Sequence, residues 1–489
     1  MASNPLPLNT RPVIFGTDGW RGIIGVDFTL ERLLKVAAAS VKELAYRSSN
    51  QKGKSRTVII GYDRRFLAYE MAEAIASVVR SCDLEPLLTD SPVPTPACSW
   101  AVFNKNALGA LVITASHNPP EWLGLKIKGP LGGSVQRDFT EAVEQRLAVS
   151  GNIALEKNLI NKFDCRMEHL SALRNKFDIP LIIRELQSLG LFLIVDPMHG
   201  SAAGCISELL GKESNGLMKE IRCNRDPLFG GNPPEPLAKY IPELIDLVKS
   251  SAKGGKLSMG LVFDGDGDRI AAIDEKGRYC STQLLMPLLI DHLAGFKKLP
   301  GSVVKTVSGC DLICSIAESH GREVIELPVG FKYIAEEMIY KEVLIGGEES
   351  GGIGFGSHIP ERDALFTSLV LLEAIAKGGI PLGKRLDQLQ ARFGEIYFDR
   401  IDLLLPDKNS IKRFESFLGN NSIDNVLGQS VAEVITLDGV KLRLNKNYWL
   451  MFRFSGTEPL LRIYCEGTSQ QEVKSTLQWA KELVYQKCM

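Results

Sequence analysis

Short apolar runs, each followed by a polar or glycine-bearing loop, recur along this chain. Gly109–Ile113, Leu191–Asp196 and Met259–Phe263 are three of them, and their lengths and boundaries are typical of buried strands. Segments with helical spacing alternate with these runs. Because alternating strands and helices form mainly parallel sheets, the sequence predicts an α/β fold. Open α/β sheets bind ligands at the carboxyl ends of their strands, so we expect several loops to face one cleft.

The first hundred residues illustrate this alternation. Apolar residues recur at helical spacing from Leu30 to Ala45, and Thr29 is a suitable N-cap for that helix. A strand is predicted at Thr57–Tyr62, a helix at Ala68–Arg80 and a further strand at Leu84–Leu88.

The end of the chain has a different pattern. Tyr448–Phe454 and Leu460–Glu466 are typical of two strands around a turn, and Ser469–Lys487 is typical of a closing helix. This order predicts a small α+β domain.

A chain of 489 residues is too long for a single core, so three or four domains are expected. We expect a linker at Ser150–Lys162, a turn at Gly277–Thr282 near the second boundary, and the approach to the last domain at Lys384–Gly394. The predicted domains are residues 1–160, 161–280 and 281–390, each α/β, and residues 391–489, which are α+β.

Composition indicates a small-molecule partner. The 57 basic and 58 acidic residues give a net charge of −1, which argues against a nucleic-acid or anionic-membrane surface. Ten scattered cysteines without a CxxC motif are typical of reduced thiols, and we expect no metal site at Cys310 and Cys314. Residues 1–12 lack an apolar signal segment, and runs such as Leu284–Ile290 are too short to span a membrane. We therefore expect a cytoplasmic protein.

The strand Gly109–Ile113 leads directly into the sequence Thr-Ala-Ser-His-Asn-Pro-Pro at positions 114–120. The two prolines stop the strand, since proline lacks the N–H that a strand ladder requires. This pattern predicts that Ser116 is presented on an exposed turn. A serine next to His117 is equally compatible with a capping or solvent contact, so this stretch alone does not establish a nucleophile.

A second loop, Asp264-Gly265-Asp266-Gly267-Asp268-Arg269, follows the strand Met259–Phe263. Three carboxylates at alternate positions, separated by glycines, can converge on one hard divalent cation. The loop is not an EF-hand, although Glu275 is twelfth from Asp264. Arg269 stands at the sixth position, where an EF-hand requires glycine, and a strand precedes the loop instead of a helix.

Other loops have the composition of phosphate or hydroxyl sites. Gly16–Gly22 carries Arg21 in a glycine-rich turn, a weak signal for phosphate binding. Glu348 and Ser350 lie among four glycines, which suits recognition of a polyol but also an exposed polar turn. The stretch Arg453–Pro459 resembles a phosphate cradle in composition, and a hairpin turn with a surface arginine is the alternative.

Taken together, four of these loops resemble those of the α-D-phosphohexomutases, in the same order and at similar spacing. They are Thr114–Pro119, Asp264–Arg269, Gly347–Gly351 and Arg453–Thr457, and the resemblance extends from Phe15 to the C-terminus. It implies three related α/β domains and a smaller C-terminal α+β domain around a deep cleft.

The resemblance also implies roles for individual residues. Ser116 would be carried as a phosphoserine, and Asp264, Asp266 and Asp268 would hold Mg²⁺ together with it. The remaining matched positions are Arg21, His117 and Lys126 as catalytic residues, and Arg269, Lys305, Lys332, Glu348, Ser350, Arg453, Ser455, Gly456 and Thr457 as substrate-binding residues. Glu348 and Ser350 would bind sugar hydroxyls, and the loop from Arg453 to Thr457 would hold the substrate phosphate.

The implied reaction has two halves. Phosphoserine 116 gives its phosphoryl group to a hexose monophosphate, and the resulting 1,6-bisphosphate turns over and regenerates the phosphoserine from its other phosphate. We expect Lys126 to be the principal acid/base group, supported by His117 and Arg21, because a lysine among cations can have a lowered pKa.

The sugar loops indicate a substrate. Gly330-Phe331-Lys332 and Glu348-Glu349-Ser350 are more similar to phosphoglucomutases than to phosphoglucosamine mutases. The expected reaction interconverts glucose 1-phosphate and glucose 6-phosphate, with Mg²⁺ as cofactor and glucose 1,6-bisphosphate as activator. Two positions depart from relatives: Leu123 replaces an asparagine, and Gly352 stands where some relatives have a histidine, which removes one candidate proton-transfer group.

Several alternatives remain at this point. The same site could serve a phosphomannomutase, a phosphoglucosamine mutase or a hexose 1,6-bisphosphate synthase. A metal-dependent sugar phosphatase and a silent sugar-phosphate-binding homologue are less favoured, because Ser116, the three aspartates and two recognition loops are all present. The partners would be small sugar phosphates, and the chain a monomer or homodimer. A hinge near residues 384–394 would let the last domain move.

Overall fold

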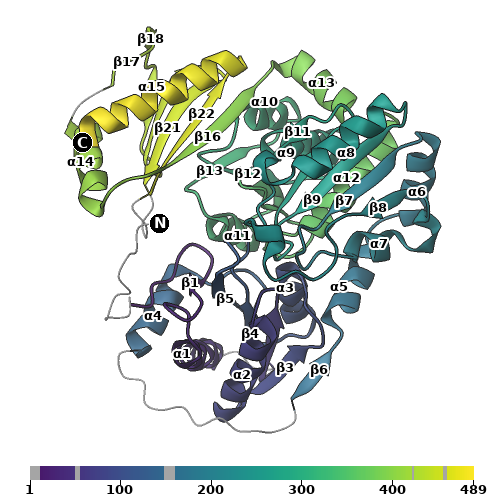
Figure 1. The fold of residues 1–489 in the computed structure, drawn as a ribbon, viewed down its shortest axis with the longest axis vertical. Coiled ribbons are helices and arrows are strands. Elements are labelled where there is room, and N and C mark those ends of the chain that lie inside the picture. Colours follow the sequence, from purple (N-terminus) through teal and green to yellow (C-terminus); the bar gives the residue numbers. More distant parts are fainter. Residues whose placement is uncertain (1–11, 50–54, 148–159, 421–422, 455–459, 489) are drawn as a thin grey trace. The chain divides into compact units, whose positions relative to one another are not determined.

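The computed structural model describes residues 12–49, 55–147, 160–420, 423–454 and 460–488 (Figure 1). The chain divides into two compact units. One comprises Met1–Tyr279 with Gly351–Pro381, and the other comprises Cys280–Ser350 with Leu382–Met489. The chain therefore passes between the units three times, next to Tyr279, Ser350 and Pro381.

The first domain is built on a six-stranded sheet with the order β1-β5-β4-β2-β3-β6. Its strands are β1 (Trp20–Ile23), β2 (Thr57–Tyr62), β3 (Glu85–Thr89), β4 (Gly109–Ile113), β5 (Trp122–Lys128) and β6 (Asn161–Phe163), and its helices are α1 (Leu30–Ser48), α2 (Ala68–Ser81), α3 (Thr95–Asn104) and α4 (Arg137–Leu147). The predicted strands and helices of this region are confirmed, and the Thr29 side chain caps α1. The sheet is parallel from β4 to β6, whereas β5 runs antiparallel to both β4 and β1.

Apolar residues on both faces of this sheet are buried. On one face, Val58 and Ile60 of β2 pack in a core with Leu33 of α1 and Ile75 of α2. On the other face, Ile59 packs in a second core with residues of α3. The continuous apolar sequence of β2 follows from this double burial, because a central parallel strand is covered on both sides.

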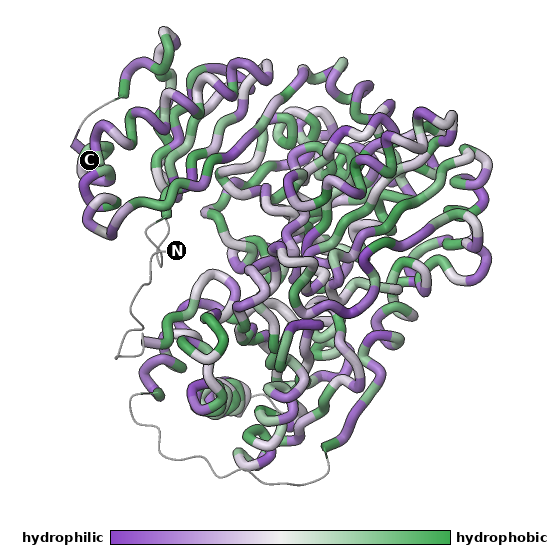
Figure 2. Tube along the Cα trace, in the orientation of Figure 1, coloured by the Kyte–Doolittle hydropathy of each residue, from purple (hydrophilic) through white to green (hydrophobic). Residues whose placement is uncertain are grey.

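The second domain has neighbouring strands in the order β10-β9-β7-β8, with β7 parallel to β8 and β9. Its elements are α5 (Cys165–Arg174), α6 (Ile179–Ser188), β7 (Phe192–Asp196), α7 (Cys205–Leu210), η1 (Lys212–Ser214), β8 (Met218–Glu220), η2 (Phe229–Gly231), η3 (Ala238–Tyr240), α8 (Pro242–Lys253), β9 (Ser258–Phe263), β10 (Ile270–Ile273) and β11 (Tyr279–Cys280). Figure 2 shows strongly hydrophobic colouring along β7 and β9, whose residues are almost all buried. The returning segment adds β15 (Ile353–Phe355) and α12 (Ala364–Gly378), and α12 packs on α6 and β10.

The second unit begins with another α/β domain in which β12 pairs in parallel with β13 and β14. Its elements are α9 (Thr282–Ile290), η4 (Asp291–Phe296), β12 (Ser302–Thr306), α10 (Asp311–Ser319), β13 (Val324–Leu327), α11 (Phe331–Tyr340), β14 (Val343–Gly347) and α13 (Leu382–Phe393). The segment Lys384–Gly394, expected to be the approach to the last domain and its hinge, is almost entirely helical because α13 covers it. The chain leaves the first unit at Pro381, directly before this helix.

The C-terminal domain is an antiparallel sheet with the order β16-β22-β21-β20-β19, accompanied by two helices. Its elements are β16 (Tyr397–Leu404), α14 (Lys408–Asn420), β17 (Asn425–Val426), β18 (Gln429–Ser430), β19 (Glu433–Ile435), β20 (Val440–Asn445), β21 (Tyr448–Phe454), β22 (Leu460–Gly467) and α15 (Gln470–Cys488). Phe452, Ile463 and Leu477 share its core. The predicted α+β architecture is confirmed.

Among the described residues, no single helix is long and apolar enough to cross a membrane. The consecutive helices α12 and α13 have the length and composition of a membrane span only when they are counted as one bent pair. Most residues of α12 are buried inside the protein.

Candidate active site

Ser116 lies three residues beyond the end of β4, and its side chain faces the loop that follows β9. Its Oγ donates a hydrogen bond to Oδ2 of Asp264 at 2.8 Å. The residue adopts a left-handed conformation with φ of 52° and is 1% exposed. The prediction of an exposed turn is therefore wrong, because the aspartate loop covers the serine.

The aspartate loop fits a divalent cation. One oxygen each of Asp264, Asp266 and Asp268 lies within 4.8 Å of the others, and all three residues are fully buried. The Oδ1 atoms of Asp266 and Asp268 accept no hydrogen bond from the described residues, so these buried oxygens are suited to a hard cation. We therefore retain the three aspartates and Ser116 as the proposed Mg²⁺ ligands.

Glycine at position 265 is required by the close approach of the two loops. A Cβ on Gly265 would lie 2.5 Å from the carbonyl oxygen of Ser116. The next glycine, Gly267, has a φ of 67°, which residues with a side chain rarely adopt. The glycines between the aspartates thus allow the three carboxylates to converge and allow the Ser116 loop to approach them closely.

The charges of the aspartates are balanced unequally. Burial, together with the neighbouring carboxylates of Asp268 and Asp266, raises the pKa of Asp264 well above its usual value. Burial also opposes the charge of Asp266, but Lys126 outweighs this effect and lowers the pKa of Asp266. A cation bound here would relieve the repulsion among the three groups.

Lys126, on β5, reaches the same cluster. Its Nζ lies 2.7 Å from Oδ2 of both Asp266 and Asp268, and 2.8 Å from Oδ2 of Asp18. Burial alone would lower the pKa of Lys126, yet the three carboxylates raise it above the usual lysine value. The expected lowered pKa is therefore wrong, because the immediate partners of this lysine are anions.

Arg21 and His117 flank the serine. Nη1 of Arg21 donates to Oδ1 of Asn118 at 2.6 Å, and Nδ1 of His117 lies 3.3 Å from Oγ of Ser116. Burial lowers the pKa of Arg21, with Arg269 acting in the same direction. Nε of Arg269 lies 3.7 Å from Oδ1 of Asp268. The structure thus brings the predicted residues of the first unit together.

Sequence reasoning missed Asp18 and Arg362, which complete this cluster. Arg362 forms ion pairs with Asp18 and, at 2.8 Å, with Oδ2 of Asp268. Arg362 is 3% exposed and immediately precedes Asp363, the N-cap of α12. A signal was present, since the charged run Glu361-Arg362-Asp363 directly before a strongly apolar helix is unusual for a solvated loop.

The predicted residues of the second unit lie near the carboxyl ends of its parallel strands. Lys305, at the end of β12, is buried, pairs with Glu326 and donates to the carbonyl of Gly309 at 3.1 Å. Glu348 directly follows β14 and is 5% exposed, and Ser350 is half-buried. Lys332, in the first turn of α11, lies with its Nζ 5.0 Å from the ring centre of Tyr333.

Arg453, on β21, is held by an acidic partner. Its Nε donates to Oδ2 of Asp438 at 2.8 Å, and Asp438 also accepts from the backbone N–H of Val329 at 2.9 Å. The other predicted residues of the phosphate loop, Ser455, Gly456 and Thr457, lie outside the described residues.

The cluster in the first unit has the chemistry of phosphoryl transfer. A buried hydroxyl faces three carboxylates suited to a hard cation, and Lys126, Arg21 and Arg269 supply positive charge beside it. Phosphoryl transfer depends mainly on positioning and on compensation of charge at the transferring group.

Four domain models of one family match the chain consecutively. They are described as phosphoglucomutase/phosphomannomutase, alpha/beta/alpha domains I, II and III, at residues 12–152, 167–277 and 282–393, and the C-terminal domain, at residues 401–479. The chain belongs to this family. It is therefore an α-D-phosphohexomutase, an enzyme of intramolecular phosphoryl transfer, and the predicted four-domain architecture is confirmed.

Individual relatives cover nearly the whole phosphohexomutase. The phosphoglucomutase/phosphomannomutase of Thermococcus kodakarensis is 28% identical over 96% of this chain and 98% of its own length. The phosphoglucosamine/phosphogalactosamine mutase of Sulfurisphaera tokodaii is 27% identical over 96% of this chain and 99% of its own. The solved structure of a Thermus thermophilus protein assigned as a phosphomannomutase is 32% identical, with a TM-score of 0.83, and covers 98% of this chain and 100% of its own.

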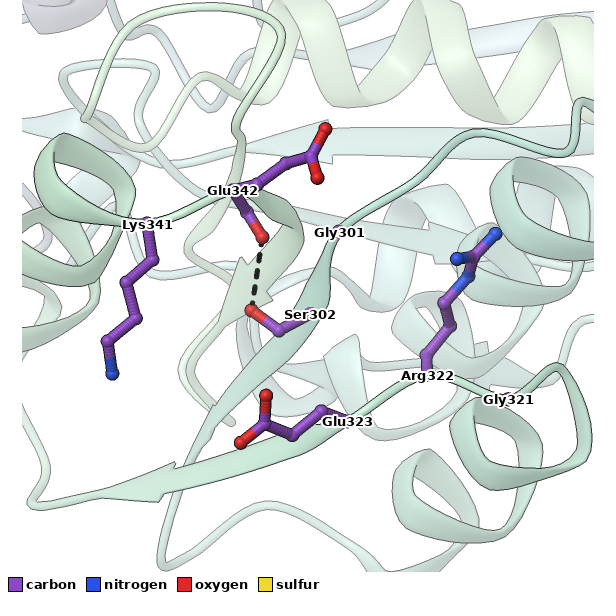
Figure 3. Close-up of a pocket in the computed structure, with 7 residues that line it drawn as sticks. All are labelled: Gly301, Ser302, Gly321, Arg322, Glu323, Lys341 and Glu342. Atoms are coloured by element: carbon purple, nitrogen blue, oxygen red, sulfur yellow. Dashed lines mark hydrogen bonds between the residues drawn. The ribbon is translucent and has the colours of Figure 1, made fainter.

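One pocket of the second unit is lined by none of the predicted residues (Figure 3). It is lined by Gly301, Ser302, Gly321, Arg322, Glu323, Lys341 and Glu342. These residues lie beside the amino ends of β12, β13 and β14. Because α/β sheets bind ligands at the opposite, carboxyl ends of their strands, we assign no role in the reaction to this pocket.

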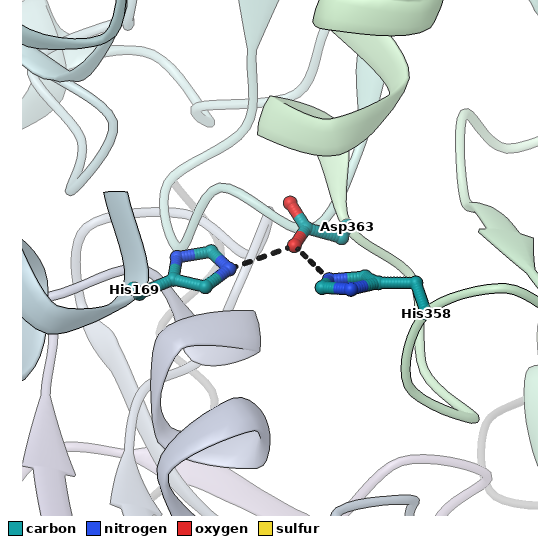
Figure 4. Close-up of side chains that lie close together, drawn as sticks. All are labelled: His169, His358 and Asp363. Atoms are coloured by element: carbon teal, nitrogen blue, oxygen red, sulfur yellow. Dashed lines mark hydrogen bonds and ion pairs between the residues drawn. The ribbon is translucent and has the colours of Figure 1, made fainter. Parts of the chain in front are cut away.

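Within the described part of the chain, His169, His358 and Asp363 form a second group of side chains that could hold a metal ion (Figure 4). Nε2 of each histidine lies 2.9 Å from Oδ2 of Asp363, whose Oδ1 accepts from two N–H groups of α12. Nζ of Lys176 lies 3.4 Å from Nδ1 of His358 and adds a positive charge. The carboxylate is thus already satisfied by hydrogen bonds, so we interpret the cluster as a structural link between α5 and the start of α12.

Proposed function

We propose that this phosphohexomutase interconverts glucose 1-phosphate and glucose 6-phosphate through a phosphoserine at position 116. The observation that carries the proposal is the 2.8 Å hydrogen bond from Oγ of Ser116 to Asp264, inside a buried cluster of three aspartates and Lys126. Burying three carboxylates costs free energy, and a serine in an ordinary solvated turn would not require such a cluster beside it.

The reaction has two halves that use the same groups. In the first half, the bond between phosphorus and Oγ of phosphoserine 116 breaks as the free hydroxyl of the sugar phosphate bonds to phosphorus, and the proton of that hydroxyl ends on Oγ. In the second half, the bisphosphate presents its other phosphate, the bond between that phosphorus and its sugar oxygen breaks as Oγ of Ser116 bonds to phosphorus, and the proton of Oγ ends on the freed sugar oxygen. The substrate thus leaves with its phosphate on the other carbon, and no phosphate is released.

The chain's own residues supply orientation and charge. Lys126 and Arg21 would offset the negative charge of the transferring group, and His117, with Nδ1 3.3 Å from Oγ, is placed to hold a proton at that oxygen. The role of Lys126 as the principal acid/base group stays a prediction. Mg²⁺, held by Asp264, Asp266, Asp268 and the phosphorylated Ser116, would act as a Lewis acid on the phosphoryl oxygens.

The choice of glucose rests on the sugar loops. Glu349 accepts a hydrogen bond from Oγ of Ser308 at 2.6 Å, which fixes one carboxylate of the Glu348-Glu349-Ser350 sequence. We propose Glu348 and Ser350 of the same sequence as the ligands of sugar hydroxyls, since a carboxylate and a hydroxyl can accept from and donate to vicinal hydroxyl groups. The names of the relatives include mutases of glucose, mannose and amino sugars, so the test includes a phosphate of each class.

The test follows ³¹P NMR of the enzyme with Mg²⁺ and glucose 1-phosphate, with and without a trace of glucose 1,6-bisphosphate. Parallel samples contain mannose 1-phosphate or glucosamine 1-phosphate. We expect conversion to glucose 6-phosphate without free phosphate, faster than for the other two sugars, lost in Ser116→Ala and retained in the control Ser77→Ala on α2.

Other spectra would contradict the proposal in defined ways. Faster turnover of glucosamine 1-phosphate or mannose 1-phosphate would assign that sugar phosphate, instead of glucose 1-phosphate, as the preferred substrate. Accumulating bisphosphate would indicate a synthase, free phosphate would indicate a phosphatase, and unchanged spectra with all three sugars would exclude hexose 1-phosphate turnover under these conditions.

A further inference from the structure

We propose that Arg65 is a positioning residue that holds the Ser116 loop in its reactive conformation. Arg65 follows β2 by three positions and is fully buried. Its two terminal nitrogens donate to four backbone carbonyl oxygens of the loop: those of Ser116 at 2.7 Å, Asn118 at 2.6 Å, Pro119 at 2.8 Å and Trp122 at 3.0 Å. One guanidinium thus fastens the loop at the serine itself and at three of the residues that follow it.

A second connection runs through Asp63. Oδ2 of Asp63 lies 3.2 Å from Nε of Arg65 and accepts the hydroxyl of Thr114 at 2.6 Å. Oγ1 of Thr114 in turn accepts the backbone N–H of Ser116 at 2.8 Å. The serine is therefore held at its N–H and at its carbonyl by one network that originates at the end of β2.

The loop requires such a restraint. Ser116 has a φ of 52°, a left-handed conformation that costs a residue with a side chain free energy and persists only where surrounding contacts enforce it. The same conformation directs Oγ towards Asp264. Arginine suits the role better than lysine, because its donors form a rigid planar fork whereas an ammonium group is a compact point charge.

The second domain holds Arg65 from the other side. The guanidinium lies over the ring of Phe229, 4.9 Å from its centre, and Nη2 of Arg225 donates to the carbonyl of Arg65 at 3.3 Å. Arg65 thus contacts the Ser116 loop and the second domain, while both of its terminal nitrogens donate to backbone carbonyls of the loop. It acts on the reaction through the serine loop, not through the substrate.

Arg65→Lys tests this role, and Arg64→Lys is the matched control. Arg64 is the preceding residue, has the same chemistry, and donates instead to the carbonyl of Cys223 at 2.7 Å. We expect Arg65→Lys to lower kcat at least thirtyfold with KM changed less than threefold, because the substrate contacts are unaltered. We expect Arg64→Lys to keep both constants within twofold.

A readout independent of activity is amide hydrogen exchange of residues 114–122, with β2 as internal reference. Exchange in this loop should become at least tenfold faster in Arg65→Lys and stay unchanged in Arg64→Lys. In Arg65→Ala, added guanidinium at low millimolar concentration should recover activity at least fivefold, whereas methylammonium should not.

Since the kinetic part rests on the proposed function, the two can fail separately. An inactive wild-type enzyme with a loop loosened by Arg65→Lys would overturn the function and retain the positioning role. Unchanged exchange at residues 114–122, or activity of Arg65→Lys within threefold of wild type, would overturn the positioning role. If Arg65→Lys does not fold, Thr114→Val replaces it, and unchanged exchange in that variant would likewise overturn the proposal.

Discussion

Arg362 occupies the space that a side chain at position 352 would need. A Cβ added to Gly352 would lie 2.2 Å from Cδ of Arg362, so a side chain at position 352 and the observed conformation of Arg362 cannot both be present. The Arg362 side chain passes through that space to reach Asp18 and Asp268. The glycine is thus the condition for placing a buried guanidinium beside the aspartate loop.

We therefore expect Gly352→Ala to lower kcat/KM about tenfold or more. The new methyl group displaces Arg362, so that less positive charge lies beside the carboxylates of Asp18 and Asp268. Each tenfold loss of kcat/KM corresponds to about 1.4 kcal/mol of transition-state stabilisation. Steady-state kinetics of the single variants and of Gly352→Ala/Arg362→Ala measure the coupling. If the effect acts through the arginine, the double variant is no slower than Arg362→Ala, whereas additive losses would contradict this explanation.

Local elements were predictable because their signals are local. The bounds of β2 and β4 agree with the predicted strands, since each is a short apolar run next to polar residues. Thr29 likewise caps α1 through a contact only three residues away. The order of strands and helices was then sufficient to predict the α/β class.

The residues of the site that the sequence analysis did not predict depend on contacts between residues far apart in the sequence. Arg362 meets Asp18 across 344 positions, and Arg65 meets the carbonyl of Ser116 across 51. The pKa of Lys126 was predicted in the wrong direction for the same reason, because its three carboxylate partners come from two loops that are distant from it in sequence. Only the resemblance to a family could place such residues together before the structure was known.

Gly265→Ala should abolish most of the activity, with an expected loss of at least a hundredfold in kcat. A methyl group at this position would meet the carbonyl oxygen of Ser116 at 2.5 Å, and a backbone atom cannot move away as a flexible side chain can. The control is Gly129→Ala, whose Cβ would make only ordinary contacts at 3.8 Å. Full activity in Gly265→Ala would show that the two loops need not approach so closely.

Binding of Mg²⁺ should stabilise the protein through the aspartate loop. At a Mg²⁺ concentration a hundred times Kd, one site adds about 2.7 kcal/mol to the free energy of unfolding. Thermal unfolding with Mg²⁺ or with EDTA measures this gain. We expect Asp264→Asn to abolish it and the exposed control Asp90→Asn to preserve it. EDTA should also remove the activity, and a Mg²⁺ response that survives in Asp264→Asn would place the ion elsewhere.

The second unit should lose stability as the pH rises from about 4.5 to about 7. Burial, with the charge of Asp311 acting in the same direction, raises the pKa of Glu466 from 4.5 to about 7. Between these values the folded protein retains a proton that the unfolded chain has released, so the free energy of unfolding falls with pH, by about 3 kcal/mol over the whole interval.

Glu466→Gln cannot release that proton and should remove this part of the pH dependence, whereas the exposed control Glu482→Gln should keep it. Urea unfolding at several pH values between 4 and 8 compares the slopes, and the difference between wild type and Glu466→Gln isolates this one group. The hydrogen bond from Nε1 of Trp449 to Oε2 of Glu466, at 2.7 Å, does not change the sign, because burial and Asp311 outweigh it. Parallel profiles for wild type and Glu466→Gln would mean that Glu466 is ionised in the folded protein throughout this range.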